Sequence, residues 1–331
     1  GIPALKIPGL DSRRRPRVAG SFATRLLWFR TGTCHRKWLQ EATEIRFNPL
    51  VDKSRTDLTG MYRFTSVARP IDPVYLTNRA LLIVLPVVGL ISAGLASFQD
   101  VGSSPLSAAF SGMLVAFAAW ALTRELAPDF QGAAFVALAL AWISSVALGT
   151  DRVLLLFIAL VLVRVVNRST GLPWRPFDTL SVLGFCAWAA INTQQPLILL
   201  IASVAFALDA TLEQPLRLHL LAAAACLVVF ARMLMGGTAL FAGDLALWDW
   251  ALAGAFALGI AAVVKTSPDP ISYCDVSPDR LDRVRVNAGL VVGFLMAVQA
   301  LVTDGRAAWL ETPIWACMIA VLLSSAARRS G

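Results

Sequence analysis

The sequence predicts an all-α protein, a polytopic transmembrane helix bundle of about ten spans with both termini in the cytoplasm. Its 331 residues are 57% hydrophobic and only 15% charged, whereas a soluble domain carries roughly 25% charged residues. From residue 80 onward, long apolar runs alternate with short polar connectors, and lysine and arginine gather in every second connector. Such a chain exposes most of its surface to lipid rather than to water.

Residues 1–79 are predicted to form a basic arm before the transmembrane domain, residues 80–331. The arm holds 15 of the 29 lysines and arginines and has no apolar run long enough to cross a bilayer. We expect it to be largely disordered or to lie on the membrane surface. The first methionine is Met61, so residues 1–60 either belong to the native protein or come from an over-extended reading frame.

Ten apolar runs approach the roughly 20 residues that a transmembrane helix needs. Glycine, proline and small polar residues separate several of them, as expected of turns. The predicted spans are residues 80–98, 105–122, 131–148, 153–166, 177–191, 196–208, 216–234, 245–264, 287–302 and 313–326.

The runs at 177–191 and 196–208 are short, which leaves two interpretations open. Either both cross the membrane, or together they form a re-entrant hairpin and eight spans remain. In a hairpin, the amides of Asn192, Gln194 and Gln195 would lie inside the protein, where transporters often bind substrate. An ordinary external turn is the interpretation that we favour.

The distribution of charge predicts the orientation. With the N-terminus inside, eleven of the fourteen lysines and arginines beyond the arm fall in internal connectors, and the exceptions are Arg152, Arg232 and Arg306. This is the positive-inside pattern. We therefore expect an integral protein of a bacterial cytoplasmic (inner) membrane, whose partners are the bilayer and anionic lipid headgroups at the cytoplasmic face. We expect no binding to nucleic acid, since anionic lipid headgroups are the simpler target for the basic residues.

Three ionisable residues near or within the spans are candidate site residues, because burying such groups in a membrane is costly. Asp178 opens the fifth run and either binds a cation or relays protons, or caps a helix. Asp249, between two tryptophans, either lines a cation or sugar site or lies at the membrane interface. His219 either titrates near neutral pH or packs as a hydrogen-bonded side chain.

The sequence predicts no metal and no cofactor. None of the five cysteines forms a CxxC pair, and the neighbouring Cys34 and His35 lack the spacing of a zinc site. Most tryptophans fall near span ends, where an interfacial position is expected; they are Trp120, Trp142, Trp174, Trp248, Trp250, Trp309 and Trp315. Trp188 falls deeper within its run, so we expect it to pack between helices.

Many spans, short loops and a few buried polar groups favour a small-molecule transporter or permease. A non-catalytic membrane assembly subunit or scaffold is an alternative, because no Walker A, GxSxG or HExxH motif is present. A second alternative is a membrane-embedded transferase with a lipid-linked substrate, for which Asp100 in the first external loop is the relevant acid. The sequence assigns no catalytic residue.

Overall fold

The computed structural model describes residues 65–67, 71–98, 104–148, 152–241 and 244–330. Most of the predicted basic arm therefore lies outside the described residues, and so do Cys34, His35 and Asp100. The described part of the chain is helical, with one isolated β-bridge between Tyr273 and Arg280.

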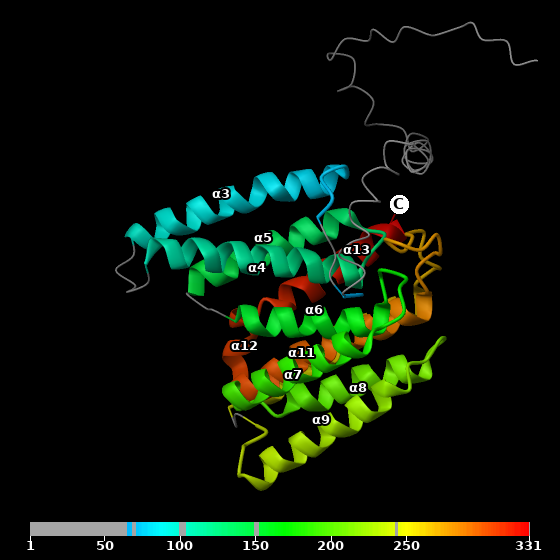
Figure 1. Cartoon of the computed structure of the whole chain (residues 1–331). Coiled ribbons are helices and arrows are strands. Elements are labelled where there is room, and N and C mark those ends of the chain that lie inside the picture. The colour runs from blue at the N-terminus through cyan, green and yellow to red at the C-terminus, as the bar shows by residue number, and fades with distance from the viewer. Residues whose placement is uncertain (1–64, 68–70, 99–103, 149–151, 242–243, 331) are drawn as a thin grey trace, which may run out of the picture. The chain divides into compact units, whose positions relative to one another are not determined.

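Ten α-helices of 15–23 residues run back and forth in the described part of the chain (Figure 1). They are α3 (Leu76–Phe98), α4 (Pro105–Leu126), α5 (Gln131–Leu148), α6 (Val153–Asn167), α7 (Pro176–Thr193), α8 (Leu197–Thr211), α9 (Leu218–Met235), α10 (Leu247–Thr266), α11 (Arg283–Asp304) and α13 (Ile314–Ser330). A 3₁₀ turn, η3 (Gly305–Ala307), and the four-residue helix α12 (Ala308–Glu311) connect α11 to α13.

Each helix coincides with one of the ten apolar runs, and several extend beyond the apolar residues. Helix α3 begins at Leu76, inside the predicted arm, and α11 begins at Arg283. At α11 the cause is local, because the Asp282 carboxylate accepts a hydrogen bond from the backbone N–H of Val284 at 2.8 Å and caps the helix before its apolar part.

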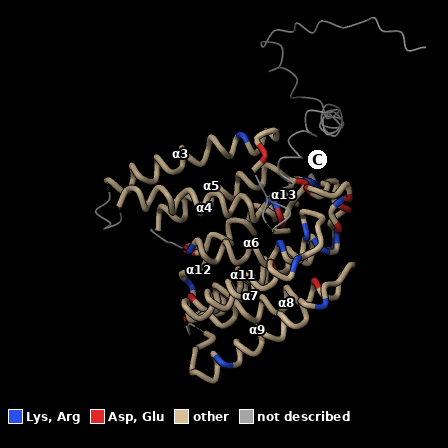
Figure 2. The backbone as a smooth tube through the Cα atoms, viewed as in Figure 1, with Lys and Arg blue, Asp and Glu red and all other residues tan. Residues whose placement is uncertain are grey.

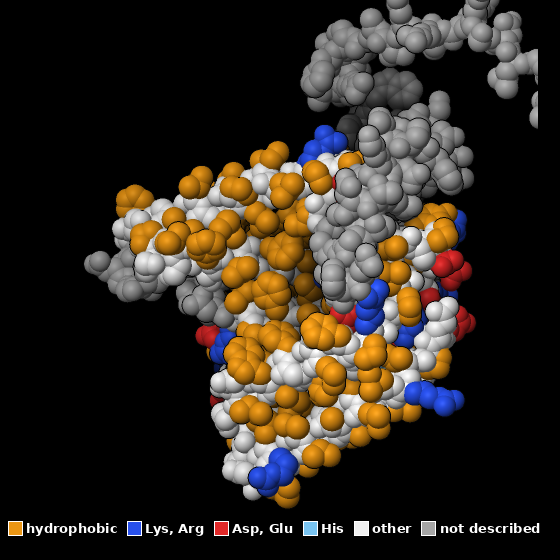
Figure 3. Space-filling view, viewed as in Figure 1, with side chains coloured by type: hydrophobic (Ala, Val, Ile, Leu, Met, Phe, Trp, Pro, Cys, Tyr) orange, Lys and Arg blue, Asp and Glu red, His pale blue; other side chains and the backbone are white. Residues whose placement is uncertain are grey.

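Several of the helices have the length and surface of membrane helices. Six segments are long and apolar enough to cross a membrane: α3, α4, α5, α9, α10 and the run from α11 through α12. Helices α6 and α8 are apolar but shorter. Large apolar side chains are exposed along these helices, such as Ile83 and Leu90 on α3, and they cover much of the face seen in Figure 3. Such a surface suits lipid.

The interior is packed through small side chains. Helix α4 packs against α3 and α5, α6 lies against α4 and α11, and α8 lies against α9. Ala116, Ala119, Ala134, Ala137 and Ala141 are buried in the centre. Small residues let helix backbones approach closely, which is the usual way that helices associate in lipid.

Charged residues gather at the two ends of the helices (Figure 2). The end formed by the last turns of α4, α6 and α8 and the first turns of α7, α9 and α11 carries most of them, and we call it the basic end. The end where α6 begins and α11 finishes is the opposite end. The turn between α7 and α8 lies there too, since Gln195 Nε2 donates to Asp304 Oδ1 at 2.9 Å. Helices α7 and α8 therefore extend as far as α6 and α11 do.

The expectation that Trp188 packs between helices was wrong. Trp188 is 54% exposed and stacks on Phe185 on the outer surface, whereas Trp120, Trp174 and Trp315 are buried. The position of a residue along an apolar run indicates its depth. It does not indicate the face of the helix, because a helix that is apolar on all sides has no distinguishing face in its sequence.

Candidate functional site

The most concentrated chemistry in the described residues is a buried charge cluster at the basic end. The carboxylate of Asp209, in the last turn of α8, is fully buried. Arg168 donates to it through Nε and Nη2, both at 2.7 Å, and Arg285 donates through Nη1 at 2.8 Å. His219 Nδ1 lies 2.6 Å from Oδ2. These four residues, with Thr179, are called the Asp209 cluster below.

Backbone geometry brings the two arginines to Asp209. Arg168 ends α6 in a left-handed conformation (φ 47°), which turns the chain sharply as helix C-termini commonly do. Arg285 lies in the first turn of α11 and also donates to the carbonyls of Val166, at 2.8 Å, and Glu213. Its guanidinium therefore connects α11 to α6 and to the segment after α8.

His219, in the first turn of α9, is fully buried between aromatic rings. The ring centroid of Trp174 is 5.6 Å away and that of Phe206 is 5.0 Å away. Nε2 lies 3.0 Å from the hydroxyl of Thr179 on α7. Because an ionised carboxylate only accepts hydrogen bonds, Nδ1 donates to Asp209. The hydroxyl of Thr179 also donates to the carbonyl of Arg175 at 3.2 Å, so His219 connects Asp209 on α8 to the first turn of α7.

The cluster has an excess of positive charge, because two arginines surround one carboxylate. Arg168, Arg285, Asp209 and His219 are all at most 9% exposed at their side chains. Taking such ions out of water costs several kcal/mol per ion, offset here by the hydrogen bonds that they share. The arrangement can stabilise an anion or hold four helices together, and its residues offer no activated nucleophile.

A second ion pair lies at the same end. Arg164, in the last turn of α6, donates through Nε to Glu125 Oε1 on α4 at 3.0 Å, and Glu125 is buried. Arg164 also donates to the carbonyl of Val67 at 3.2 Å. Arg164 therefore fixes α6 to α4 and to residues 65–67.

Asp178 is buried but lies outside the Asp209 cluster. It is in the first turn of α7, whereas Arg175 occupies the N-cap position, so the cap interpretation was wrong. Its Oδ2 accepts hydrogen bonds from the backbone N–H of Ser66 at 2.8 Å and from the hydroxyl of Ser66 at 2.6 Å. Asp178 thus holds residues 65–67 against the helices.

Asp249 lies at the start of α10, near the opposite end. Its Oδ2 accepts from the backbone N–H of Ala246 at 2.9 Å and from Arg306 Nε at 3.3 Å, and Oδ1 accepts from Trp309 Nε1 at 3.2 Å. The neighbouring Trp248 is exposed, with the Arg306 guanidinium over its ring. Asp249 is therefore bonded to its helix terminus, Arg306 and Trp309.

The three amides of the α7–α8 turn are separated from one another. Asn192 and Gln194 are exposed and donate to carbonyls of their own helix, at Trp188 and Ile191. Gln195 is only 8% exposed and bonds to α11.

Gln195 belongs to a polar network at the opposite end. It accepts from Gln299 Nε2 at 3.1 Å and donates to Asp304, which also accepts from Arg152. The hydrogen bond to Asp304 raises the pKa of Arg152 above its usual range. We call Gln195, Gln299, Asp304 and Arg152 the opposite-end network.

Of the six predicted site residues, His219 alone belongs to the Asp209 cluster. Sequence reasoning missed Asp209, Arg168 and Arg285 as partners, because each lies where an apolar run meets a connector. The available signal was that Asp209 directly follows the apolar run ending at Leu208. Among the described residues, no three histidine, cysteine or acidic side chains are grouped so as to hold a metal ion.

No protein family, curated protein or solved structure matches this chain. The function is therefore inferred from the geometry of the two polar networks.

Proposed function

We propose that the chain is an integral protein of a bacterial cytoplasmic membrane, with ten spans and with the basic end and both termini in the cytoplasm. The support is the agreement between ten helices and ten apolar runs, together with the gathering of positive charge at one end. Cytoplasmic connectors are rich in lysine and arginine in membrane proteins generally. The extent of α7 and α8 favours two full spans over a re-entrant hairpin.

Within this architecture we propose that the protein is a small-molecule transporter or permease. The observation that carries the proposal is the meeting of Arg168, His219 and Arg285 at the buried carboxylate of Asp209, with the four residues coming from four helices. Apolar side chains of similar size often stabilise a protein as well as a buried ion cluster does. Ionisable groups inside membrane proteins accordingly tend to mark pathways for substrates, ions or protons.

The two polar networks suit the two ends of a transport path. The Asp209 cluster joins α6, α8, α9 and α11 at the basic end. The opposite-end network joins α11 to the start of α6 and to the α7–α8 turn. Alternating access requires each end to close in turn, and ion pairs between helices can form and break as the helices move. In this proposal each network closes one end, and the positive Asp209 cluster favours a small anion as the substrate.

The test is solute entry into liposomes that contain the purified protein. A panel of labelled carboxylates, phosphate esters, amino acids and sugars is offered to liposomes with wild-type protein, with Asp209→Asn, with Thr179→Val, or with no protein. We expect wild type to accelerate entry of at least one anion and both cluster variants to slow it. Asp269→Asn, at an exposed connector position, is the matched control and should transport as wild type does. Equal entry of every solute into empty and protein-containing liposomes would rule the proposal out.

A scaffold within a larger membrane assembly is the second candidate. The alanine-packed contact between α4 and α5 favours it, because closely packed helices leave little room for movement. A scaffold would copurify with a defined partner and would show no solute entry in the liposome assay. The transferase alternative depends on Asp100, which lies outside the described residues.

A further inference from the structure

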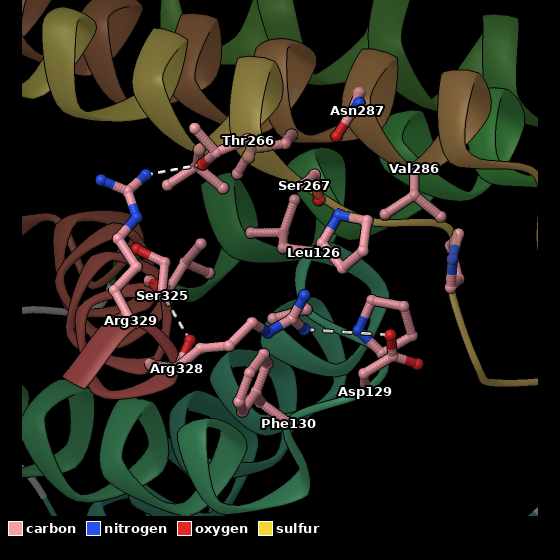
Figure 4. A pocket seen from close by; sticks show the side chains of 18 residues that line it. Leu126, Asp129, Phe130, Thr266, Ser267, Val286, Asn287, Ser325, Arg328 and Arg329 are labelled. Carbon is pink, nitrogen blue, oxygen red and sulfur yellow. Dashed lines mark hydrogen bonds and ion pairs between the residues drawn. The ribbon is translucent and has the colours of Figure 1, made fainter. Parts of the chain in front are cut away.

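A cavity of about 130 Å³ lies at the basic end, away from the Asp209 cluster. It is bounded by the ends of α4, α10 and α13, by the start of α11 and by the connector between α4 and α5 (Figure 4). One water needs roughly 10–15 Å³ by the same measure, so the space is sufficient for a group of several atoms.

The cavity combines an apolar wall with a polar rim. Leu126, Val263, Leu290 and Val321 contribute apolar side chains. Hydroxyl and amide groups lie among them, contributed by Thr266, Ser267, Asn287, Ser324 and Ser325. This composition is that of a site for an amphipathic molecule rather than for a fully hydrated ion.

Two consecutive arginines from the last turn of α13 line the cavity and extend in different directions (Figure 4). Arg329 Nη2 donates to Thr266 Oγ1 on α10 at 2.6 Å. The Arg328 guanidinium lies over the ring of Phe130 and has a nitrogen 3.9 Å from the Asp129 carboxylate. The two guanidinium groups therefore flank the same cavity.

The acidic group at the cavity is already occupied by other donors. Asp129 Oδ1 accepts from the backbone N–H of Ser272 at 2.9 Å and from its hydroxyl at 2.8 Å. The backbone N–H of Ile271 also donates to this carboxylate, at 3.1 Å. The connector between α10 and α11 thus supplies most of the hydrogen bonds to this carboxylate. With two arginines and one aspartate, the lining of the cavity has a net positive charge.

We propose that this cavity binds the headgroup of an anionic phospholipid, with its phosphate held by Arg328 and Arg329 and the start of its acyl chains against Leu126, Val263 and Leu290. A basic pocket between helix ends at the membrane surface is the usual form of such a site. Arginine forms two-pronged hydrogen bonds with phosphate, which a point charge cannot do. The proposal uses none of the residues of the Asp209 cluster and does not depend on transport.

A simpler role for the arginines is to offset the negative ends of the helix dipoles, because α4, α10 and α13 all finish here. That role explains basic residues in a last turn. It does not explain an adjoining cavity with an apolar wall. The two explanations differ in the effect of filling the cavity. A bulky side chain there should prevent lipid binding, whereas it should not affect an interaction between the arginines and the helix dipoles.

The full chain is purified from vesicles of mixed phosphatidylglycerol and phosphatidylcholine. Native mass spectrometry then measures which lipids remain bound to it. The variants are Arg328→Ala with Arg329→Ala, the same pair changed to lysine, and Ser325→Trp, which adds bulk at the cavity wall and keeps both arginines. Arg306→Ala, a half-exposed arginine near the opposite end, is the matched control.

We expect wild type and Arg306→Ala to retain phosphatidylglycerol over phosphatidylcholine. The double alanine variant should lose this retention by about 30-fold, if each arginine contributes as basic residues do at an anionic surface. The lysine pair should retain an intermediate amount, and Ser325→Trp should lose binding despite its charge. Unchanged retention in either the double alanine variant or Ser325→Trp overturns the proposal. Binding of inorganic phosphate by a protein that retains no phosphatidylglycerol also overturns it, because the cavity would then be a site for a free ion.

Discussion

Arg168 and Asp209 form a two-pronged ion pair, in which Nε and Nη2 of the guanidinium each lie 2.7 Å from one carboxylate oxygen. The pair connects the end of α6 to the end of α8, and Arg285 and His219 complete the coordination of the same carboxylate. Each oxygen of Asp209 therefore has two charged or polar donors. Removing the carboxylate leaves two buried arginines facing each other.

Asp209→Asn is expected to destabilise the protein by about 3–5 kcal/mol, because the change leaves buried charges without their partner. Thermal or denaturant unfolding in detergent measures the effect. The control Asp269→Asn, at an exposed position, should unfold as wild type does. If the two variants unfold alike, the cluster does not stabilise the basic end.

Replacing the whole cluster should cost less than breaking it. We expect Asp209→Leu combined with Arg168→Met and Arg285→Met to be more stable than Asp209→Asn, because no unpaired charge remains buried. The same unfolding assay compares the two. A triple variant less stable than Asp209→Asn would show that the cluster contributes net stability, and the argument that it is retained for function would fail.

Gly289→Ala should separate α6 from α11. A Cβ at Gly289 would lie 2.0 Å from Asn167 Oδ1, and Asn167 is buried and donates to the carbonyl of Glu125 at 2.8 Å. Overpacking of this kind costs about 1–3 kcal/mol. Gly254→Ala is the matched control, since a Cβ there meets nothing within 4 Å, and it should be neutral or slightly stabilising. Equal melting temperatures for the two variants would contradict the close approach at Gly289.

Asp178→Ala should release residues 65–67 and leave the Asp209 cluster intact. The variant loses both hydrogen bonds from Ser66, each to a charged group and worth about 1.5–3 kcal/mol. Limited proteolysis around Ser66 should become faster, and solute entry into liposomes should continue. Loss of transport with unchanged proteolysis would instead place Asp178 on the transport path, where the sequence alone first suggested it.

The sequence was sufficient to locate the helices, because a membrane helix must be apolar for nearly its whole length. Helix α5 has the predicted bounds, α6 begins where predicted and ends one residue later, and α9 differs by one or two residues at each end. The ends differ most where charged residues continue a helix, as Arg283 does at α11. Local hydrogen bonds determine where these helices begin and end, and the hydropathy of the sequence does not predict such hydrogen bonds.

The candidate site was only partly visible in the sequence. His219 drew attention because it lies inside an apolar run, but its partner Asp209 is ten residues away on another helix. Arg168 resembled any other connector arginine, and only the left-handed turn at the end of α6 directs it inward. Which side chains pair between two helices depends on which faces of the helices are in contact. The sequence of a helix that is apolar on all sides does not indicate that face.

The central claim is that the basic end faces the cytoplasm and that the helices cross the membrane. A membrane-impermeant maleimide tests it in intact bacteria, with single cysteines placed at Arg306 near the opposite end and at Asp279 at the basic end, both in a Cys34→Ser background. The four native cysteines in the described residues are buried. The account predicts that the cysteine at position 306 is labelled in intact cells and that the one at position 279 is labelled only after permeabilisation. The reverse pattern, or recovery of the protein in the soluble fraction without detergent, would contradict it.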